Sequence, residues 1–246
     1  MVFYIYNNDI ILLVLRGVFM NIALQFIFIF YVGCTLGWVL ELFYRRIVHG
    51  HWINPGFLIG PYLPIYGFGL TTLTFIFLLF KDSNLNPIII IILMGILMTI
   101  IEFIGGIIGN VNNVKLWDYS NEWGNYKGII CPKFSLIWTI ISGLYYYFIA
   151  SYVMNALVWF SKNLTFSYTL GLFTGFIVID FFYSGKLYLV IRKYAKNNDI
   201  TVKYEQFKMH IKDIQNKRKE KYSFLNPFKQ TKSLIDYLGD YKNKGR

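Results

Sequence analysis

The stretch NPGFLIGPYLPIYGFG, residues 54–69, decides the fold because it puts helix breakers into an otherwise apolar chain. It holds three prolines and four glycines, and Asn54 is its only strongly polar side chain. Hydrocarbon tolerates irregular backbone only where protein buries it or water reaches it. We predict that residues 54–64 form an irregular or re-entrant segment that lines a cavity. The alternative is an ordinary loop before a helix that tolerates proline.

The composition around this stretch is that of a membrane protein. Of 246 residues, 56% are apolar, 20% are aromatic and only 15% are charged, which is too apolar for an ordinary soluble domain. A transmembrane helix needs about 20 apolar residues. The predicted fold class is therefore an all-α polytopic membrane protein with five transmembrane helices. These spans are expected at about 21–44, 62–80, 87–109, 134–160 and 166–191.

Basic residues orient the predicted spans. Residues 192–246 carry 15 Lys/Arg against 6 Asp/Glu, and the positive-inside rule puts such a tail in the cytoplasm. Counting back puts loops 45–56 and 110–133 inside with five Lys/Arg, and loops 81–86 and 161–165 outside with two. We predict a multi-pass plasma-membrane protein with its N-terminus outside and its C-terminus inside. The many residues with AT-rich codons suggest a low-GC Gram-positive bacterium.

The two ends of the chain differ from the spans. Residues 1–19 fit neither a span nor a signal peptide, so we expect a non-native or mis-annotated extension and a true start at Met20. In the tail, apolar residues at helical spacing predict an amphipathic helix over about 199–221. Its stripe suits anionic lipid headgroups or a partner helix, and no nucleic-acid-binding module is recognisable. The stripe consists of Ile200, Tyr204, Phe207, Ile211 and Ile214.

Three carboxylates, Glu41, Glu102 and Asp180, fall inside the predicted spans. They lie roughly 5, 10 and 16 Å from the inner ends, in the half of the bilayer that holds the irregular loops. Acids in lipid are costly and usually face a pathway, a partner or water. Glu41 could instead pair with Arg45 one helical turn later, and Asp180 could bond to Ser184. Glu102 has no basic residue within a turn.

Glycines four residues apart allow close helix contact in the first, third and fifth spans. The first two pairs share a helix face with Glu41 and Glu102 respectively. Contact between the first and third spans along these faces would bring the two glutamates together and suit proton or cation handling. Asp180 points away from the helix face that carries Gly171 and Gly175, so it need not lie near the two glutamates. The pairs are Gly33/Gly37, Gly105/Gly109 and Gly171/Gly175.

A second stretch, WGNYKGIICP at 123–132, has the layout of WINPGFLIGP at 52–61. Each follows a span that enters the cytoplasm, which predicts two parallel helix–loop–helix repeats, with chance similarity as the alternative. Before the second stretch, Trp117 and Tyr119 are typical of a membrane interface, and Asp118 of a solvated loop. No metal-ligand spacing, P-loop or catalytic nucleophile pattern stands out. We therefore predict no metal and no cofactor.

Several motifs occur in a recognisable order: GWVLE at 37–41, the stretch 54–69, Glu102 with its following glycines, WDYS at 117–120 and NYKGIIC at 125–131. Together they resemble the bacterial membrane proteins of the ABC-transporter type IV, or CmpB-like, family, over roughly residues 25–185. The resemblance implies a permease-like protein that could work with a cytoplasmic ATPase subunit. The family positions carried over are Gly37, Trp38, Glu41, Asn54, Gly56, Gly60, Pro61, Pro64, Tyr66, Gly67, Glu102, Trp117, Asp118, Tyr119, Asn125 and Gly128.

The chain departs from the family pattern at two places. It has Pro55 where the family favours Arg, and it lacks the second acid that often follows the Glu102 position. Loss of an Arg–acid pair would explain both departures. 

The sequence favours a membrane transport component with an inward-facing polar cavity for a cation, a proton or an amine-bearing ligand. A homodimer is also expected, because five small spans enclose little volume. The alternatives are an intramembrane enzyme acting on a lipid or isoprenoid headgroup, with Glu102 and Asp118 as acid and base, and a scaffold whose tail recruits a cytoplasmic partner. The cavity candidates are Glu41, Asn54, Tyr66, Glu102, Trp117, Asp118, Tyr119, Asn125 and Asp180. The loop-forming candidates are Pro55, Gly56, Gly60, Pro61, Pro64, Gly67 and Gly128.

Overall fold

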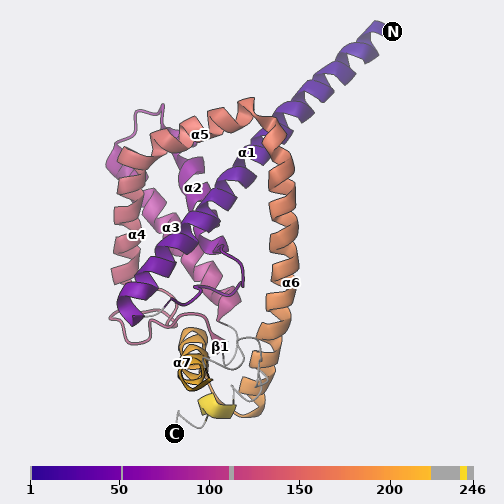
Figure 1. The fold of residues 1–246 in the computed structure, drawn as a ribbon. Helices are drawn as coiled ribbons and strands as arrows, with labels where there is room; N and C mark the ends of the chain where they lie inside the picture. Colours follow the sequence, from indigo (N-terminus) through magenta and orange to yellow (C-terminus); the bar gives the residue numbers. More distant parts are fainter. Residues whose placement is uncertain (1, 51, 111–113, 223–238, 243–246) are drawn as a thin grey trace.

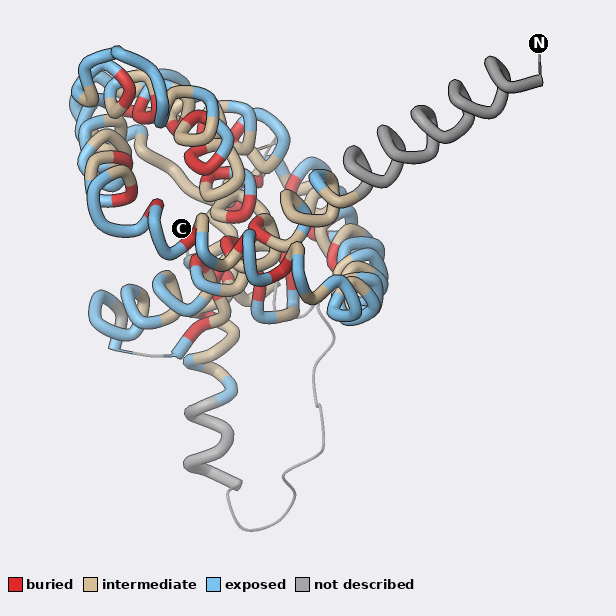
Figure 2. The backbone as a smooth tube through the Cα atoms, turned by 90° about the horizontal axis from the view of Figure 1, so that it is seen from above, coloured by how far each residue is buried: buried red, intermediate tan, exposed pale blue. Residues whose placement is uncertain are grey.

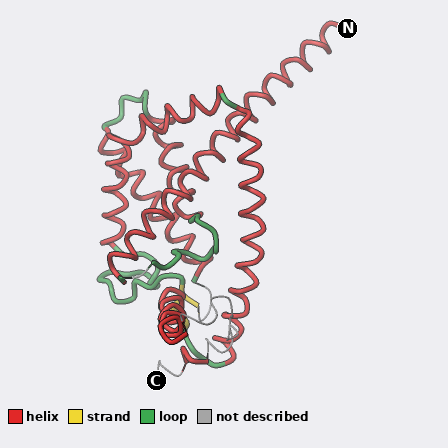
Figure 3. The backbone as a smooth tube through the Cα atoms, viewed as in Figure 1, coloured by secondary structure: helices red, strands yellow, loops and turns green. Residues whose placement is uncertain are grey.

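The computed structural model describes residues 2–50, 52–110, 114–222 and 239–242, and the side chains of 2–20, 49 and 216–222 fall outside this description. The described chain is almost entirely helical (Figures 1 and 3). Its α-helices are α1 Val2–His49, α2 Pro64–Phe80, α3 Pro87–Gly109, α4 Pro132–Leu144, α5 Ala150–Lys162, α6 Ser167–Asn197 and α7 Tyr204–Tyr222. The short elements are π-turn η1 Tyr145–Ile149, 3-10 turn η2 Leu164–Phe166, and strands β1 Val114–Lys115 and β2 Val202–Lys203.

Proline begins three of these helices. Pro64, Pro87 and Pro132 are the first residues of α2, α3 and α4, where a missing backbone N–H costs nothing. Before α3, Asn86 caps the helix by accepting a hydrogen bond from the Ile88 backbone N–H at 2.9 Å. These prolines therefore start helices instead of kinking them.

Four helical stretches are long and apolar enough to cross a membrane: Asn21–Val48, Pro87–Gly109, Pro132–Lys162 and Leu164–Asn197. Helix α2 is apolar but has 17 residues, which gives a length of roughly 26 Å, just under a bilayer core. The architecture is compatible with the helical membrane protein that the composition predicts. The count of five spans and their orientation remain predictions.

The loop after α1 explains why α2 is short. Residues 52–63 are irregular, and the Leu63 backbone N–H donates to the Cys34 carbonyl at 2.9 Å. Cys34 lies 15 residues before the end of α1, so the loop has run back along that helix by roughly 22 Å before α2 begins. Gly56 permits the turn with its φ of +75°, a conformation that other residues rarely adopt.

The fourth predicted span, 134–160, is bent instead of straight. Figure 1 shows α4 upright at one edge of the bundle and α5 crossing its upper end. The π-turn η1 joins them, and insertions of this kind bend helices. Tyr145 anchors the bend, because it is fully buried and its hydroxyl lies 2.9 Å from the Thr74 hydroxyl on α2.

The glycine stripes pack differently from the prediction. A Cβ on Gly33 would lie 2.8 Å from the Tyr66 carbonyl oxygen, and one on Gly67 would lie 2.5 Å from Cys34 Sγ. The α1 stripe therefore brings α1 against α2, and not against the third span as one possible packing of the stripes would have done. On α3, the small residue Gly106 makes room for Ile129 of the following loop. On α6, a Cβ added to Gly171 or Gly175 would meet no atom of another described element within 4 Å.

Helix α6 stands beside this bundle and carries the tail (Figure 1). Its contacts with α1 include a hydrogen bond of 2.6 Å between the Tyr31 and Thr174 hydroxyls. At its far end, Ile191 and Ala195 pack with Val202 and with Phe207 of α7, and β1 pairs in parallel with β2. The apolar stripe of the tail thus packs on the protein itself. Figure 2 shows buried residues where helices meet and exposed residues on the outer faces, which suits contact with lipid.

Candidate functional site

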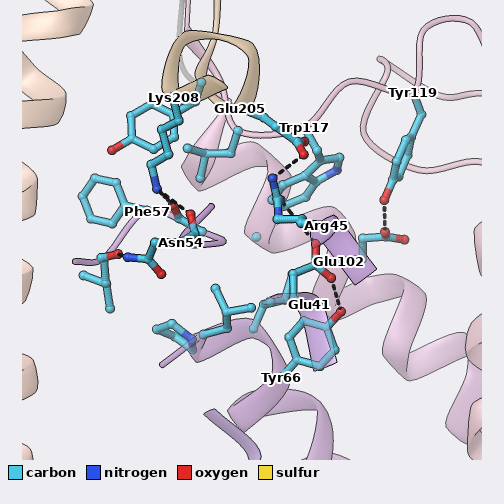
Figure 4. A pocket seen from close by; sticks show the side chains of 18 of the residues that line it. Glu41, Arg45, Asn54, Phe57, Tyr66, Glu102, Trp117, Tyr119, Glu205 and Lys208 are labelled. Carbon is cyan, nitrogen blue, oxygen red and sulfur yellow. Dashed lines mark hydrogen bonds and ion pairs between the residues drawn. The ribbon is translucent and has the colours of Figure 1, made fainter. Parts of the chain in front are cut away.

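A cavity of about 280 Å³ opens among α1, the first loop, the start of α2, α3, the second loop, α4 and α7 (Figure 4). We define the first loop as the described residues of 50–63, without 51, and the second loop as the described residues of 110–131, without 111–113. Both loops begin at the end of the bundle that holds α7, and the first loop runs back toward the middle of the bundle (Figures 1 and 3). The polar lining residues are Glu41, Arg45, Asn54, Tyr66, Glu102, Trp117, Tyr119, Trp138, Tyr204, Glu205 and Lys208.

Glu102 is the most enclosed acid of this cavity, at 3% exposure. Its Oε1 accepts from the Tyr119 hydroxyl at 3.0 Å, and its Oε2 accepts from Trp138 Nε1–H at 3.1 Å. Tyr119 is itself fixed by stacking on Phe134, with ring centroids 4.3 Å apart. Within the described residues Glu102 has no ion-pair partner, so two neutral donors hold this carboxyl group.

Glu41 has the opposite environment, because Arg45 pairs with it at 3.3 Å as the helical spacing predicts. Arg45 also pairs with Glu205 of α7 and lies between the two acids (Figure 4). The Tyr66 hydroxyl donates to the other Glu41 oxygen at 3.1 Å. Arg45 is only 11% exposed, and its buried Nε has no hydrogen-bond partner among the described residues. Arg45 and its two carboxylate partners therefore connect α1 to α7 of the tail.

Lys208 of α7 closes the cavity against the first loop. Its Nζ donates to the carbonyls of Asn54 at 3.1 Å and Gly56 at 2.5 Å. Burial, helped by the charge of Arg45, lowers the pKa of Lys208 to about 8, although Glu205 acts in the other direction. The Lys208 ammonium also lies 4.8 Å from the ring centroid of Tyr204. The tail is therefore part of the cavity wall.

Asn54 holds the shape of the first loop. Its Oδ1 accepts from Trp38 Nε1–H at 2.6 Å, and its Nδ2 donates to the carbonyls of Leu58 and Ile59 at 3.0 and 2.8 Å. The amide thus uses both ends on the protein, although the residue lines the cavity. Its role in this structure is to position the loop.

Asp180 holds the same loop from α6 and does not line the cavity. Its carboxylate accepts from the backbone N–H groups of Ile59 at 3.2 Å and Gly60 at 2.7 Å. It also accepts from the hydroxyls of Tyr62 and Ser184, each at 2.6 Å. The bond to Ser184 is the predicted local alternative, and the bonds to the loop add a fastening that the sequence does not reveal.

Asp118 fastens the second loop to the tail. Its carboxylate pairs with Lys115 at 3.0 Å and with Lys203 of β2 at 2.9 Å, and it accepts from the Ser120 backbone N–H. Burial alone would raise the pKa of the Asp118 carboxyl group, but the hydrogen bonds from Ser120, Lys203 and Lys115 hold this pKa well below its usual range. The expected solvated loop acid is thus only 9% exposed and fully partnered, and it lies outside the cavity.

Asn125 shapes the turn of the second loop. Its Nδ2 donates to the carbonyls of Ser120 and Glu122, and its Oδ1 accepts from the Gly128 backbone N–H at 3.1 Å. Gly128 has a φ of +68°, which favours glycine. Trp117 is oriented by donating to the Ile129 carbonyl at 3.0 Å. The loop in this way delivers Trp117 and Tyr119 to the cavity.

The structure brings six of the nine cavity candidates together and leaves Asp118, Asn125 and Asp180 outside. Sequence reasoning missed Trp138, Glu205 and Lys208. Trp138 could have been found, because a buried indole N–H needs an acceptor and Glu102 is unpaired in sequence. The tail residues carry no such signal. Among the described residues, no three His, Cys, Asp or Glu side chains group as metal ligands, and the side chains of His49 and His51 fall outside the description.

Searches of curated proteins and of solved structures found no match. A family model described as "Putative ABC-transporter type IV" matches residues 28–185, which is more than half of the chain. The matched region includes all six cavity candidates and ends before Glu205 and Lys208. It supports a transport-related role for a protein whose apolar helices are those of a membrane protein. The chain belongs to the ABC-transporter type IV family.

Proposed function

We propose that this protein is a permease-like membrane transport component whose cavity takes a cation, a proton or an amine-bearing ligand at Glu102. The observation that carries the proposal is the buried carboxyl group of Glu102, which faces a cavity and, among the described residues, is held by the neutral donors Tyr119 and Trp138 without a basic partner. The proposal extends the transport-related role of the family to a specific site.

The electrostatics of Glu102 support this assignment. A buried carboxylate is stable only when a positive charge or several hydrogen bonds replace its hydration. Glu41 has Arg45 for this purpose, whereas Glu102 lacks any basic partner among the described side chains. A bound cation or a proton would stabilise the Glu102 carboxylate in place of the missing basic partner. Its release would leave the buried charge uncompensated again. Such a group binds and releases a positive charge readily.

The basic tail supports an inward-facing cavity. The second loop, the start of the first loop and α7 lie at one end of the bundle (Figure 1), and most of the Lys/Arg residues outside the predicted spans belong to these loops and to the tail. We place this end in the cytoplasm, where anionic lipid headgroups and an ATPase subunit would both meet it. The second loop and α7 would provide the docking surface for the ATPase, and a second copy of the chain would enlarge the pathway.

The test is flux through proteoliposomes that contain the full chain. Efflux of protons, K⁺ and methylammonium is measured under an imposed gradient, and under ATP where an ATPase subunit co-purifies. Glu102→Gln is expected to abolish the flux of the transported ion. Asp82→Asn makes the same change of carboxylate to amide on an exposed residue outside the cavity and outside the proposed docking surface, and it should leave flux unchanged. Equal flux in Glu102→Gln, or turnover of a lipid by the purified protein alone, would contradict the proposal.

A further inference from the structure

We propose that the ligand of this cavity is an organic ammonium ion, a protonated primary, secondary or tertiary amine that carries an apolar group. This inference rests on the proposed function and narrows its three ligand classes to one. Three features carry it: the free acceptor capacity of Glu102, the aromatic walls of the cavity, and the donor set that a metal ion would need.

Glu102 retains room for a donor. An ionised carboxylate offers about four lone-pair positions, and Tyr119 and Trp138 occupy one on each oxygen. Trp138 can only donate, so this oxygen is fixed as an acceptor. The remaining positions suit an N–H group of an ammonium ion. A quaternary ammonium has no N–H and would leave them unused.

The walls of the cavity are aromatic. Seven aromatic side chains line the cavity: Phe57, Tyr66, Trp117, Tyr119, Trp138, Phe181 and Tyr204. Aromatic faces attract cations, most strongly for tryptophan, and their area favours an apolar substituent on the nitrogen. A cavity of about 280 Å³ also exceeds the space that a proton or a single small ion requires.

The oxygen donors do not suit a metal ion. Mg²⁺ and Ca²⁺ require six or more oxygen ligands, often from several carboxylates. Here Glu41 and Glu205 are both engaged by Arg45, and Lys208 covers the Asn54 and Gly56 carbonyls. Arg45 and Lys208 together balance two of the three carboxylates that line the cavity, which leaves one negative charge and favours a single positive charge over two.

Equilibrium binding to the purified full chain in detergent tests the inference. Isothermal titration calorimetry with benzylammonium, tetramethylammonium and K⁺ should give affinities in that decreasing order. Glu102→Gln should weaken benzylammonium on the order of 100-fold, because the charged acceptor is lost. Glu122→Gln should bind like the parent. Trp117→Leu should weaken binding about tenfold, whereas Trp117→Phe keeps a ring and should lose less.

The Glu102→Gln variant can keep its fold, because glutamine satisfies both neighbours. Its amide oxygen can accept from Trp138, and its NH₂ can donate to the Tyr119 hydroxyl oxygen. A melting temperature close to the parent confirms this. If it falls, Tyr119→Phe provides a second variant that keeps the charge and should weaken benzylammonium by a few-fold.

The outcomes separate this inference from the proposed function. K⁺ binding as tightly as benzylammonium, or tetramethylammonium binding as tightly, would overturn the organic ammonium assignment. Proton or K⁺ flux that requires Glu102 without amine binding would also overturn it and leave the transport function intact. Absence of both binding and Glu102-dependent flux would overturn the two together. Benzylammonium binding that is lost in Glu102→Gln supports the inference.

Discussion

The two loops of the cavity are each tied to the tail by one lysine, and the lysines meet different chemistry. Lys203 reaches the second loop through the Asp118 carboxylate at 2.9 Å. Lys208 reaches the first loop through two backbone carbonyls, of Asn54 and Gly56. One contact pairs opposite charges, and the other buries a cation on neutral acceptors.

This difference shows where the molecule is sensitive. A buried lysine without a direct carboxylate partner favours the neutral form, so the pKa of Lys208 falls to about 8. A carboxylate held by two lysines favours its charged form, so the pKa of Asp118 is held low. The tail contact of the first loop thus responds to alkali, and that of the second loop responds to acid.

The largest loss of stability is expected from breaking the hydrogen bonds that hold the first loop to Asp180 of α6. Asp180→Ala would leave the Ile59 and Gly60 backbone N–H groups and the Tyr62 hydroxyl without their acceptor. The loss should be about 3 kcal/mol of unfolding free energy, since charge-assisted bonds to partly buried donors are broken. Thermal unfolding in detergent measures the loss. Unchanged stability, with the first loop no more sensitive to protease, would show that the loop does not need α6.

The next effect separates the two lysines by pH. Because the pKa of Lys208 in the folded chain lies below the 10.5 of a free lysine, the folded state binds fewer protons between about pH 8 and 10.5. Stability should therefore rise with pH through this interval, by about 2 kcal/mol. The difference in unfolding free energy between parent and Lys208→Met, measured at pH 7.5 and 9.5, isolates this contribution. Lys203→Met should keep the pH dependence, and a slope shared by both variants would refute the assignment.

The helical fold is largely predictable from sequence because apolar length and prolines mark each helix. The run of apolar residues at 87–109 and the prolines before α2, α3 and α4 are local signals. The bend at η1 carries no proline or glycine within its five residues, YYYFI, so the sequence suggests a straight span. The glycine stripes predict close packing but do not name the partner helix, which depends on how far the first loop runs back along α1.

The candidate site is predictable from sequence where a residue would be costly in free energy to bury without a functional reason. An acid in an apolar helix, Glu102, indicates a site because burial without a partner is expensive. Asp118 resembles a solvated loop acid, since the pairing with Lys203 depends on β1 meeting β2 across the fold. The similar stretches at 52–61 and 123–132 both use their asparagine to hold loop carbonyls. The first runs back along much of α1, however, whereas the second packs on the last two turns of α3, so sequence similarity did not specify their paths.

A smaller effect is expected for the charged tie of the second loop. Asp118→Asn keeps an acceptor for Ser120 but loses the attraction to Lys115 and Lys203, at a cost of about 1.5 kcal/mol. Glu122→Gln breaks a more exposed pair with Lys133 in the same loop and should cost less than about 0.5 kcal/mol. Chemical unfolding of both variants at pH 7 gives the comparison. Equal costs would mean that burial of Asp118 adds nothing. The parent should also lose the Asp118 contribution as pH falls below 3.8.

The smallest effect concerns the tyrosines that hold the two cavity glutamates. Tyr119→Phe removes one of two donors to the unpaired Glu102, and Tyr66→Phe removes a donor from Glu41, which keeps Arg45. Each change should cost about 1 kcal/mol of stability. The two should differ in benzylammonium binding, because only Tyr119 orients the carboxylate that meets the ligand. Tyr119→Phe should weaken binding a few-fold and Tyr66→Phe should leave it nearly unchanged. An equal loss in both, measured by calorimetry, would mean that the ligand contacts the two glutamates together and that Arg45 does not neutralise Glu41.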